Sequence, residues 1–438
     1  MGDFENALSL AKNVLSLSKN NQAQANIIAQ SIIGEAYHCQ GELALAYLSF
    51  QEVKTQAKVQ NMHQTVIWSL YQQAEILYAQ SHCNKAKQHI KKAIELLNLH
   101  HLQNLPLYVF PLHFNAELAY QDGDFVEAER LCKEAFSIIA AYGETWVLYS
   151  YTMQSKIALE QNNIERAKYL IGEIELLLRN KIYHSDWLAA ANYSRLKYWR
   201  LIKDIPAIER WLKTAPKPLK AFNRFDQCHN RNRVRALIQL GRLEDARELL
   251  EENLLIAKSC QLHIDINRNL ILLTSVESRL NLFTNAKLHL SEAVESSLFT
   301  GLKTNFVRES NNLKPIYQLL LKDPTLVNAV KLKLSKLLFL SGINLAEPIK
   351  NPFKREEISK IQAHPQAPRL VKNIPLTARE WEVLGFIYSG YRNHQIAKTM
   401  GVAATTVKSH IRNIYQKLGL ENRKEAILLA EHLLTLLQ

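Results

Sequence analysis

The stretch Gly241-Arg-Leu-Glu-Asp-Ala-Arg-Glu-Leu-Leu250 contains a pattern that returns along the first 300 residues of the chain. A turn residue stands five positions before an alanine, and an apolar residue stands four positions after it. The central alanines are Ala7, Ala46, Ala86, Ala128, Ala167, Ala207, Ala246 and Ala286, separated by 39, 40, 42, 39, 40, 39 and 40 residues. So constant a period is typical of repeat proteins, whose units stack on their neighbours.

Each repeat is expected to contain two helices joined by a short turn. The turn residues are Gly2, Gly41, Ser81, Gly123, Asn162, Gly241 and Asn281, and apolar helical stretches such as Ile33-Gly34-x-x-Tyr37 precede them. The small alanine lies where the two helices must approach closely. Since no stretch with strand periodicity bounded by turns stands out, the chain is predicted to be all-α.

This unit resembles the tetratricopeptide repeat (TPR), lengthened from the usual ~34 residues to about forty. The resemblance implies a TPR-like superhelix. The unit around Ala207 departs from the pattern, because Ile202 occupies the turn position and Pro206, Pro216 and Pro218 lie nearby. A kink or an insertion is expected there.

The C-terminal residues show helix-turn-helix spacing. Thr377 and Glu380 form a predicted capping box for a helix that runs to about Ser389. Asn393 is the expected cap of a short helix over 394–400, and Gly401 supplies the turn before a third helix over 404–418.

The third helix has two distinct faces. Val407, Ile411, Ile414 and Leu418 form an apolar stripe, which leaves Thr405, Lys408, Ser409, Arg412 and Gln416 on the opposite face. Lys408 and Arg412 lie one turn apart, so both can reach the same DNA groove, where cations suit guanine edges and phosphate oxygens.

Together these motifs resemble the LuxR-type helix-turn-helix. They comprise Leu-Thr-x-Arg-Glu at 376–380, Ile396-Ala397, Thr406-Val407-Lys408-x-His410 and Lys417-Leu418-Gly419. Within that group the chain is most similar to the MalT-like ATP-dependent transcriptional activators. The resemblance implies DNA contacts by Thr405, Thr406, Lys408, Ser409, His410, Arg412, Asn413 and Lys417. It also implies self-association through a fourth helix from about Arg423. Ala403 stands where most relatives have serine, so the usual cap of the recognition helix is absent.

The expected organisation has four parts. A TPR-like solenoid spans 1–300, terminal capping helices span 301–345 with Pro315 and Pro324 at helix starts, a basic mobile linker spans 346–374, and a four-helix LuxR-type domain spans 375–438. The repeat register places Gly2 in a turn, so the first helix of that unit would precede Met1. The chain is therefore expected to be the C-terminal part of a longer regulator with an ATPase module.

Aromatic and acidic residues recur along the first helices of the early repeats. Projecting the register onto the concave surface gives Trp68, Tyr71, Glu75, Tyr78, Phe110, His113, Glu117, Tyr120 and Tyr149. Rings can stack on sugars and carboxylates can accept hydroxyl hydrogen bonds. This surface therefore suits an oligosaccharide inducer such as the maltotriose that the resemblance implies, and Arg231, Arg235 and Arg268 would make it basic. The alternative is that the aromatic stripe is core.

Composition favours an anionic partner and a reducing compartment. The net charge is +13, and residues 350–438 contain fourteen Lys and Arg against seven Asp and Glu. Five widely spaced cysteines indicate neither a disulfide framework nor a zinc site. Without a signal or a membrane-spanning segment, a soluble cytoplasmic protein with no membrane partner is expected.

The sequence contains no catalytic constellation. It lacks a His-Glu-x-x-His motif, and Gly301-Leu-Lys-Thr304 is too short for a phosphate-binding loop. We therefore expect no enzyme and no cofactor in this chain, with ATP bound only by a full-length relative. The resemblance implies an activator of maltose or maltodextrin genes that binds promoter DNA and engages RNA polymerase. Two alternatives stay open: a protein-binding scaffold, and a constitutive or inactive DNA-binding fragment without ligand control.

Overall fold

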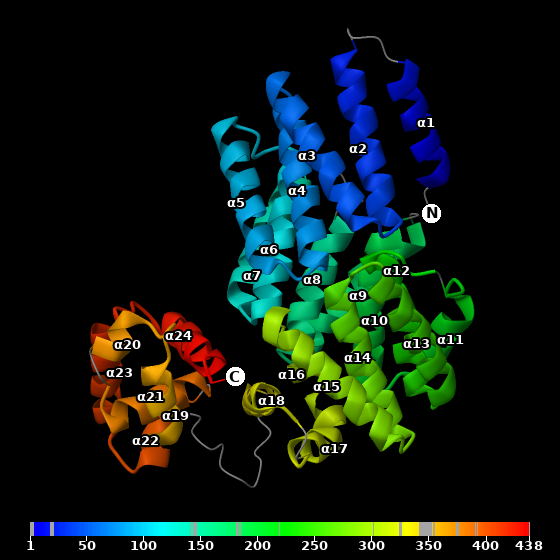
Figure 1. Ribbon diagram of the computed structural model, residues 1–438. Coiled ribbons are helices and arrows are strands. Elements are labelled where there is room, and N and C mark those ends of the chain that lie inside the picture. The colour runs from blue at the N-terminus through cyan, green and yellow to red at the C-terminus, as the bar shows by residue number, and fades with distance from the viewer. Residues whose placement is uncertain are drawn as a thin grey trace. The chain divides into compact units, whose positions relative to one another are not determined.

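The computed structural model describes residues 4–17, 22–140, 142, 147–180, 183, 185–218, 220–300, 302–323, 326–340, 353, 355–373, 376–389, 391 and 393–437. The chain divides into two compact units, Met1–Asn305 and Phe306–Gln438 (Figure 1). All regular elements in the described part are helical, as the sequence predicts. None of the described helices is both long and apolar enough to cross a lipid bilayer.

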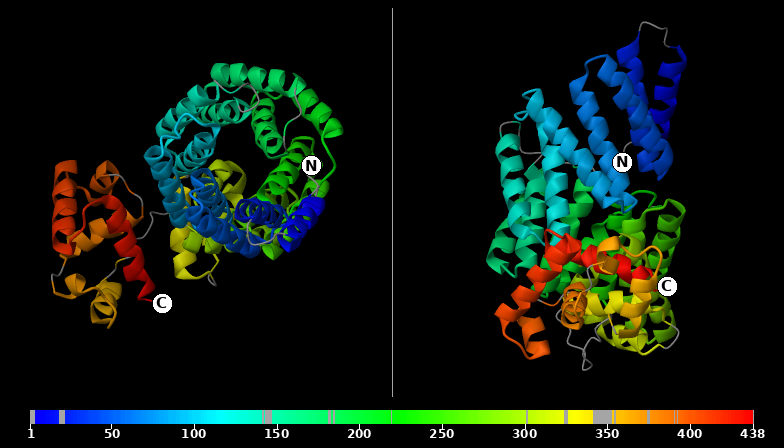
Figure 2. Two further views of the ribbon diagram at one scale, coloured as in Figure 1. Left: turned by 90° about the horizontal axis from the view of Figure 1, so that it is seen from above. Right: turned by 60° about the vertical axis from the view of Figure 1, so that its left-hand side comes forward.

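The first unit is a stack of helix pairs that curves round a central axis, as the view from above shows (Figure 2). After α1 (Phe4–Leu17), the first helices of the pairs are α2 (Ala23–Cys39), α4 (His63–Ala79), α6 (Val109–Asp122), α8 (Val147–Glu160), α10 (Ser185–Leu201), α12 (Arg224–Gln239) and α14 (His263–Arg279). The second helices are α3 (Leu43–Val59), α5 (Cys83–Leu99), α7 (Phe125–Ile139), α9 (Ile164–Asn180), α11 (Ile205–Thr214), α13 (Leu243–Ser259) and α15 (Phe283–Thr300). A short 3-10 turn, η1 (Pro106–Tyr108), precedes α6.

The alanine register is confirmed. From Ala46 to Ala286 each marker alanine is buried, and all but Ala207 are the fourth residue of a second helix. The turn residues that precede them adopt the left-handed conformation, at Gly41, Ser81, Gly123, Asn162, Gly241 and Asn281. Ala7 is half-buried, and Gly2 lies outside the described residues. A left-handed residue ends each first helix and lets the second helix fold back against it.

The unit around Ala207 differs from the others by one residue. The left-handed residue is Lys203, only four positions before Ala207, and α11 is shorter than the other second helices. Pro206 causes no kink, because it occupies the first turn of α11, where a missing N–H leaves no helical hydrogen bond unmade. The unit therefore departs from the pattern through a shorter second helix, which an irregular segment follows.

The solenoid completes a turn and closes on itself. The start of α12 reaches the end of α2, where Asn223 Nδ2 donates to the Cys39 carbonyl at 3.0 Å. A β-carbon added to Gly41 would lie 2.6 Å from the Phe222 carbonyl oxygen and 2.5 Å from Cys260 Sγ. We call this contact region, formed by 222–224 with Cys39, Gly41 and Glu75, the seam.

The second unit contains the remaining helices. They are α17 (Ser310–Leu321), α18 (Asn328–Leu340), α19 (Arg355–Ala363), α20 (Arg369–Asn373), α21 (Ala378–Tyr388), α22 (Asn393–Met400), α23 (Ala404–Leu418) and α24 (Arg423–Thr435), while α16 (Thr304–Arg308) crosses the boundary. Pro315 lies inside α17 and does not start it, contrary to expectation. Pro324 lies outside the described residues.

The segment expected to be a mobile linker contains α19 and α20. Phe353, Ile361 and Val371 are buried in the same hydrophobic cluster as Trp381, and the rings of Phe353 and Trp381 lie 5.0 Å apart. The linker interpretation is wrong for this part, because its scattered apolar residues gain a partner surface on α21. Residues 341–352, 354, 374 and 375 lie outside the described residues.

Candidate nucleic-acid interface and solenoid groove

Helix α23 buries one side and exposes the other. Val407, Ile414 and Leu418 pack in the core of the second unit, with Ile411 half-buried beside them. The predicted DNA contacts Thr405, Thr406, Lys408, Ser409, Arg412 and Asn413 are exposed, and His410 is half-buried. Within the described residues neither Lys408 nor Arg412 has a carboxylate partner. The exposed face of α23 therefore carries two cations that no carboxylate of the described residues neutralises.

The start of α23 lacks a side-chain cap. Ala403 is the residue before the helix, and it accepts no side-chain hydrogen bond because it has no polar atom. Gly401 makes the preceding turn with φ +67°. The predicted absence of a cap and the predicted glycine turn are both confirmed.

The capping box at the start of α21 also holds the end of α23. Thr377 N–H donates to Glu380 Oε2 at 2.7 Å, and Lys417 Nζ reaches the same oxygen at 2.7 Å. Burial raises the pKa of the Glu380 carboxyl, but the hydrogen bonds from Lys417 and Thr377 outweigh it and leave this pKa below its ordinary value. Lys417 is thus tied to the domain core, and its predicted contact with DNA stays a prediction.

Arg423 connects α24 to the turn before α22. Its guanidinium donates to the Tyr391 carbonyl and, at 3.3 Å, to Asn393 Oδ1. Asn393 was expected to cap α22, but it is the first residue of that helix and its side chain accepts from Arg423. Sequence reasoning missed this role of Arg423, because nothing local marks a contact made 30 residues away.

In the solenoid, the predicted aromatic residues of α4 and α6 do come together. The Trp68 ring lies 5.3 Å from Tyr71 and 5.2 Å from Phe110, and Trp68 Nε1 donates to Glu35 Oε1 at 2.8 Å. Tyr71 and Phe110 are 5.4 Å apart. All three rings are half-buried, so they form a partly open aromatic cluster.

Glu75 is held by a partner that the sequence did not suggest. Arg224 of α12 pairs with Glu75 Oε2, and Tyr71 OH donates to Glu75 Oε1 at 3.2 Å. The Arg224 guanidinium also lies over the ring of Tyr78, 5.6 Å from its centre. Burial, and secondarily the charge of Glu75, raises the pKa of Tyr71 well above its ordinary value.

The predicted residues of α6 make fixed polar contacts. His113 Nε2 lies 2.8 Å from Ser150 Oγ, and burial lowers the pKa of His113 to about 3. Glu117 pairs with Lys156 at 3.4 Å. Burial alone would raise the pKa of Glu117, but Lys156 and Arg268 lower it to about 2. Tyr120 OH donates to Glu160 at 2.8 Å.

The predicted groove residues therefore divide into two sets. Tyr78 and Tyr120 belong to hydrophobic core clusters, as the core interpretation anticipated. Trp68 and Tyr71 are half-buried, while the acidic residues Glu75 and Glu117 are buried but paired with cations. Among the predicted aromatic residues, Phe110 and Tyr149 are half-buried as well.

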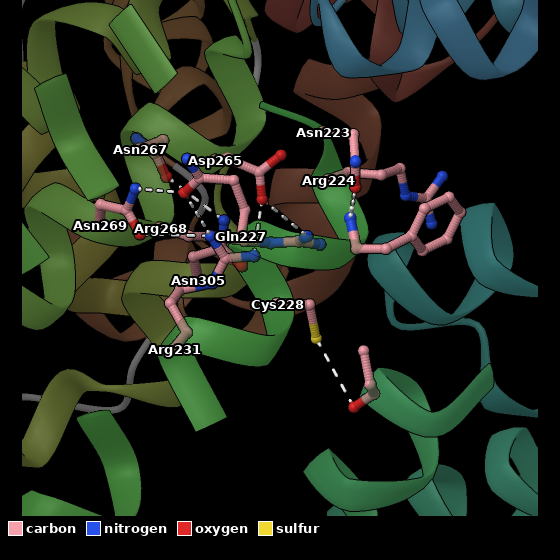
Figure 3. A network of polar contacts seen from close by, with 12 residues as sticks. Asn223, Arg224, Gln227, Cys228, Arg231, Asp265, Asn267, Arg268, Asn269 and Asn305 are labelled. Carbon is pink, nitrogen blue, oxygen red and sulfur yellow. Dashed lines mark hydrogen bonds and ion pairs between the residues drawn. The ribbon is translucent and has the colours of Figure 1, made fainter. Parts of the chain in front are cut away.

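A polar network joins α12, α14 and α16 farther along the solenoid (Figure 3). Arg231 Nη2 contacts Asp265 Oδ1 at 2.6 Å, and both side chains are almost fully buried. Asn269 donates to Gln227 at 2.8 Å, and Asn305 donates to Asn267 at 3.3 Å.

Comparison with known proteins matches both units of the chain. Residues 1–323 match the family described as the MalT-like TPR region, and residues 374–430 match the luxR family of bacterial regulatory proteins. Two curated relatives are each called HTH-type transcriptional regulator MalT and are each 35% identical to this chain. The one from Serratia proteamaculans (strain 568) aligns over 437 residues, 100% of this chain and 48% of the relative. The one from Vibrio cholerae serotype O1 aligns over 438 residues, 99% and 48%.

The chain thus spans about half the length of the curated relatives it matches. Among solved structures, the crystal structure of the P58(IPK) TPR domain covers 79% of this chain and all of that one. The identity is 14% and the TM-score 0.20, too low a similarity to argue from.

Proposed function

The chain belongs to the MalT-like family of LuxR-type, DNA-binding transcriptional regulators, and we propose that it activates maltose or maltodextrin genes in response to an oligosaccharide. Binding to promoter DNA is the output, with α23 in the major groove. The observation that carries the proposal is the exposed face of α23, where Lys408 and Arg412 have no carboxylate partner among the described residues and are backed by a buried apolar stripe.

Lys408 and Arg412 have different roles in the proposed contact with DNA. An arginine can donate two parallel hydrogen bonds to guanine O6 and N7, whereas a lysine acts as a point charge on bases or phosphates. Thr405, Thr406, Ser409, His410 and Asn413 supply shorter polar contacts around them. The Lys417–Glu380 ion pair joins the C-terminal end of α23 to the start of α21.

Helix α24 is the proposed surface for self-association on DNA. Ala426, Ala430 and Leu433 face the domain core and are fully buried, while Leu428 on another side is half exposed. We also propose that the DNA-bound protein contacts RNA polymerase and that it acts in the cytoplasm.

The proposed inducer is maltotriose, bound at the Trp68 end of the groove. The half-buried rings of Trp68, Tyr71 and Phe110 offer apolar faces for sugar rings. Calorimetry of the purified chain with maltotriose tests this, with Trp68→Ala as the variant and Tyr142→Ala, at an exposed ring outside the groove, as the control. An unchanged affinity for maltotriose in a folded Trp68→Ala protein would show that the sugar does not bind at this site.

The experiment for the proposal as a whole is a gel shift of maltose-gene promoter DNA by the purified chain, with and without maltotriose, alongside a mass measurement. Specific binding that maltotriose strengthens is the expected result. Specific binding that ignores the sugar would favour a fragment without ligand control. Failure to bind any DNA would favour the protein-binding scaffold.

A further inference from the structure

Three arginines of the solenoid have one carboxylate among them at ion-pair distance in the described residues. Arg231 and Arg235 lie one turn apart on α12, and Arg268 lies on α14. Asp265 is the only carboxylate within 4.0 Å of any of them in the described part of the chain. Its Oδ1 is 2.6 Å from Arg231 and 3.8 Å from Arg268 (Figure 3).

The other contacts of this cluster are neutral. Arg231 donates to Asn269 at 3.2 Å and to Gln227 at 3.5 Å, and Arg235 donates to Asn232 at 3.5 Å. Amide oxygens satisfy hydrogen-bond donors but bring no charge to balance a guanidinium. Burying uncompensated charge is costly, so an anion that reaches this cluster would be bound favourably.

The charges of the three arginines act on one another. Burial lowers the pKa of Arg231, and the positive charges of Arg268 and Arg235 lower it further, while only Asp265 and Cys228 oppose them. Arg235 and Arg268 are each half-buried, unlike Arg231, so part of each side chain is exposed to solvent. For Arg268, burial lowers the pKa, but Tyr78, Asp265 and Glu117 together raise it above its ordinary value. An anion placed beside Arg235 and Arg268 would relieve the repulsion that acts on Arg231.

An aromatic ring and a further cation stand next to Arg235. The Arg235 guanidinium lies over the ring of Tyr193, 4.8 Å from its centre, and Lys156 Nζ lies 5.9 Å from the same ring. Lys156 has one carboxylate partner, Glu117 at 3.4 Å, and Glu117 also accepts from Gln121 at 2.7 Å. The nearby carboxylates are thus already engaged, and positive charge remains in excess.

We propose that Arg235 and Arg268, with Lys156 beside the Tyr193 ring, form a site for the oxyanion of a small sugar derivative. The planar guanidinium suits the paired oxygens of a phosphate ester or a carboxylate, and the tyrosine face suits the sugar ring that carries it. This site goes beyond the maltotriose proposal, because maltotriose carries no charge and its rings are placed at Trp68. It also stands independently of DNA binding.

Calorimetry on the full chain tests the site with four probes: glucose 6-phosphate, gluconate, inorganic phosphate and glucose. Glucose 6-phosphate or gluconate is expected to bind saturably and about tenfold or more tightly than glucose, since hydrogen bonds to charged groups exceed neutral ones. Stronger binding of glucose 6-phosphate together with inorganic phosphate identifies a phosphate ester as the source. Stronger binding of gluconate identifies a carboxylate.

The informative variant is Arg235→Gln, because Arg235 makes no ion pair in the described structure and its loss removes only a long hydrogen bond to Asn232 and the contact with the Tyr193 ring. It should weaken anion binding about tenfold, Arg235→Lys should weaken it less, and glucose binding should not change. The matched control is Arg242→Gln, at the exposed arginine that precedes α13 and pairs with Asp245 at 2.6 Å. Its anion affinity should equal that of the wild type.

Two results would overturn the site: no saturable binding of any anion by the wild-type chain, or equal affinity in a folded Arg235→Gln protein. Circular dichroism melting confirms that the variant is folded. The same preparations are used in the promoter gel shift, so loss of anion binding with normal DNA binding separates this proposal from the proposed function.

Discussion

Glu75 of α4 and Arg224 of α12 are 149 residues apart in the sequence and form an ion pair inside the solenoid. The pair lies next to the hydrogen bond from Asn223 to the Cys39 carbonyl. Together these contacts join the sixth helix pair, counted from α2, to the first and second pairs. A solenoid contact of this kind couples units that are far apart in the stack, whereas ordinary repeats contact only their neighbours.

Breaking the seam pair should destabilise the first unit. Glu75→Gln leaves the half-buried Arg224 guanidinium without this carboxylate, which should lower the free energy of unfolding by about 1–3 kcal/mol. Urea denaturation followed by circular dichroism measures the loss. Lys87→Gln breaks an ion pair with Asp122 whose two side chains are well exposed, and it should cost less than about 1 kcal/mol. An equal loss of unfolding free energy in the two variants would show that the Glu75–Arg224 pair stabilises the fold no more than an exposed ion pair does.

Two glycines offer a matched test of the close approach at the seam. Gly41 and Gly123 have nearly equal backbone angles, φ +80° and φ +82°, but an added β-carbon meets Phe222 and Cys260 at Gly41 and open space at Gly123. Gly123→Ala should cost about 1 kcal/mol from backbone strain. Gly41→Ala should cost a further 1–3 kcal/mol, roughly the effect of overpacking. Unfolding curves in urea compare the two, and equal costs would contradict the close contact.

His113 should make the solenoid sensitive to mild acid. Its pKa of about 3 in the folded chain lies below the ordinary value of 6.5, so the unfolded chain takes up its proton first. Stability from His113 is complete above pH 6.5 and is lost as the pH falls towards 3. His113→Gln should remove about 1–2 kcal/mol of the fall in stability between pH 6.5 and about 5.

Thermal or urea unfolding at several pH values checks this prediction. The other buried histidines titrate in both proteins, so the difference between the two curves isolates His113. Parallel curves for the wild type and His113→Gln would show that this imidazole does not resist protonation.

The two cations of α23 should affect DNA binding in different ways. Lys408→Gln should weaken binding to all sequences and reduce the slope of affinity against salt by about one ion. Arg412→Ala should lower discrimination between promoter and unrelated DNA, by about 1–3 kcal/mol for a base contact. Fluorescence anisotropy at several salt concentrations measures both effects. Arg379→Gln is the control, because Arg379 is exposed on α21 and paired with Glu382 at 2.7 Å.

If both substitutions in α23 left affinity, salt slope and sequence preference unchanged while the protein stayed folded, this helix would not be the DNA-reading element. An effect of Arg379→Gln as large as that of Lys408→Gln would instead indicate a response to charge anywhere on the domain.

Local patterns predicted the elements that depend on neighbouring residues. The capping box of Thr377 and Glu380, the left-handed turns such as Gly41 and Asn162, and the buried marker alanines all follow from short-range rules, and all are found in the structure. The same rules failed for 355–373, where apolar residues are sparse and their partner surface lies on α21, and for Pro315, which α17 accommodates in its interior.

The sequence by itself determined the repeat, its period and the family, because helix pairing and the recognition helix are encoded by residues a few positions apart. Only the tertiary structure decided which charges meet. The pairs Glu75–Arg224 and Lys417–Glu380 join residues 149 and 37 positions apart, and the Arg231–Asp265 pair joins two helices of different repeats. Coulombic interactions depend on distance in space, which the curvature of the solenoid and the packing of the C-terminal helices set.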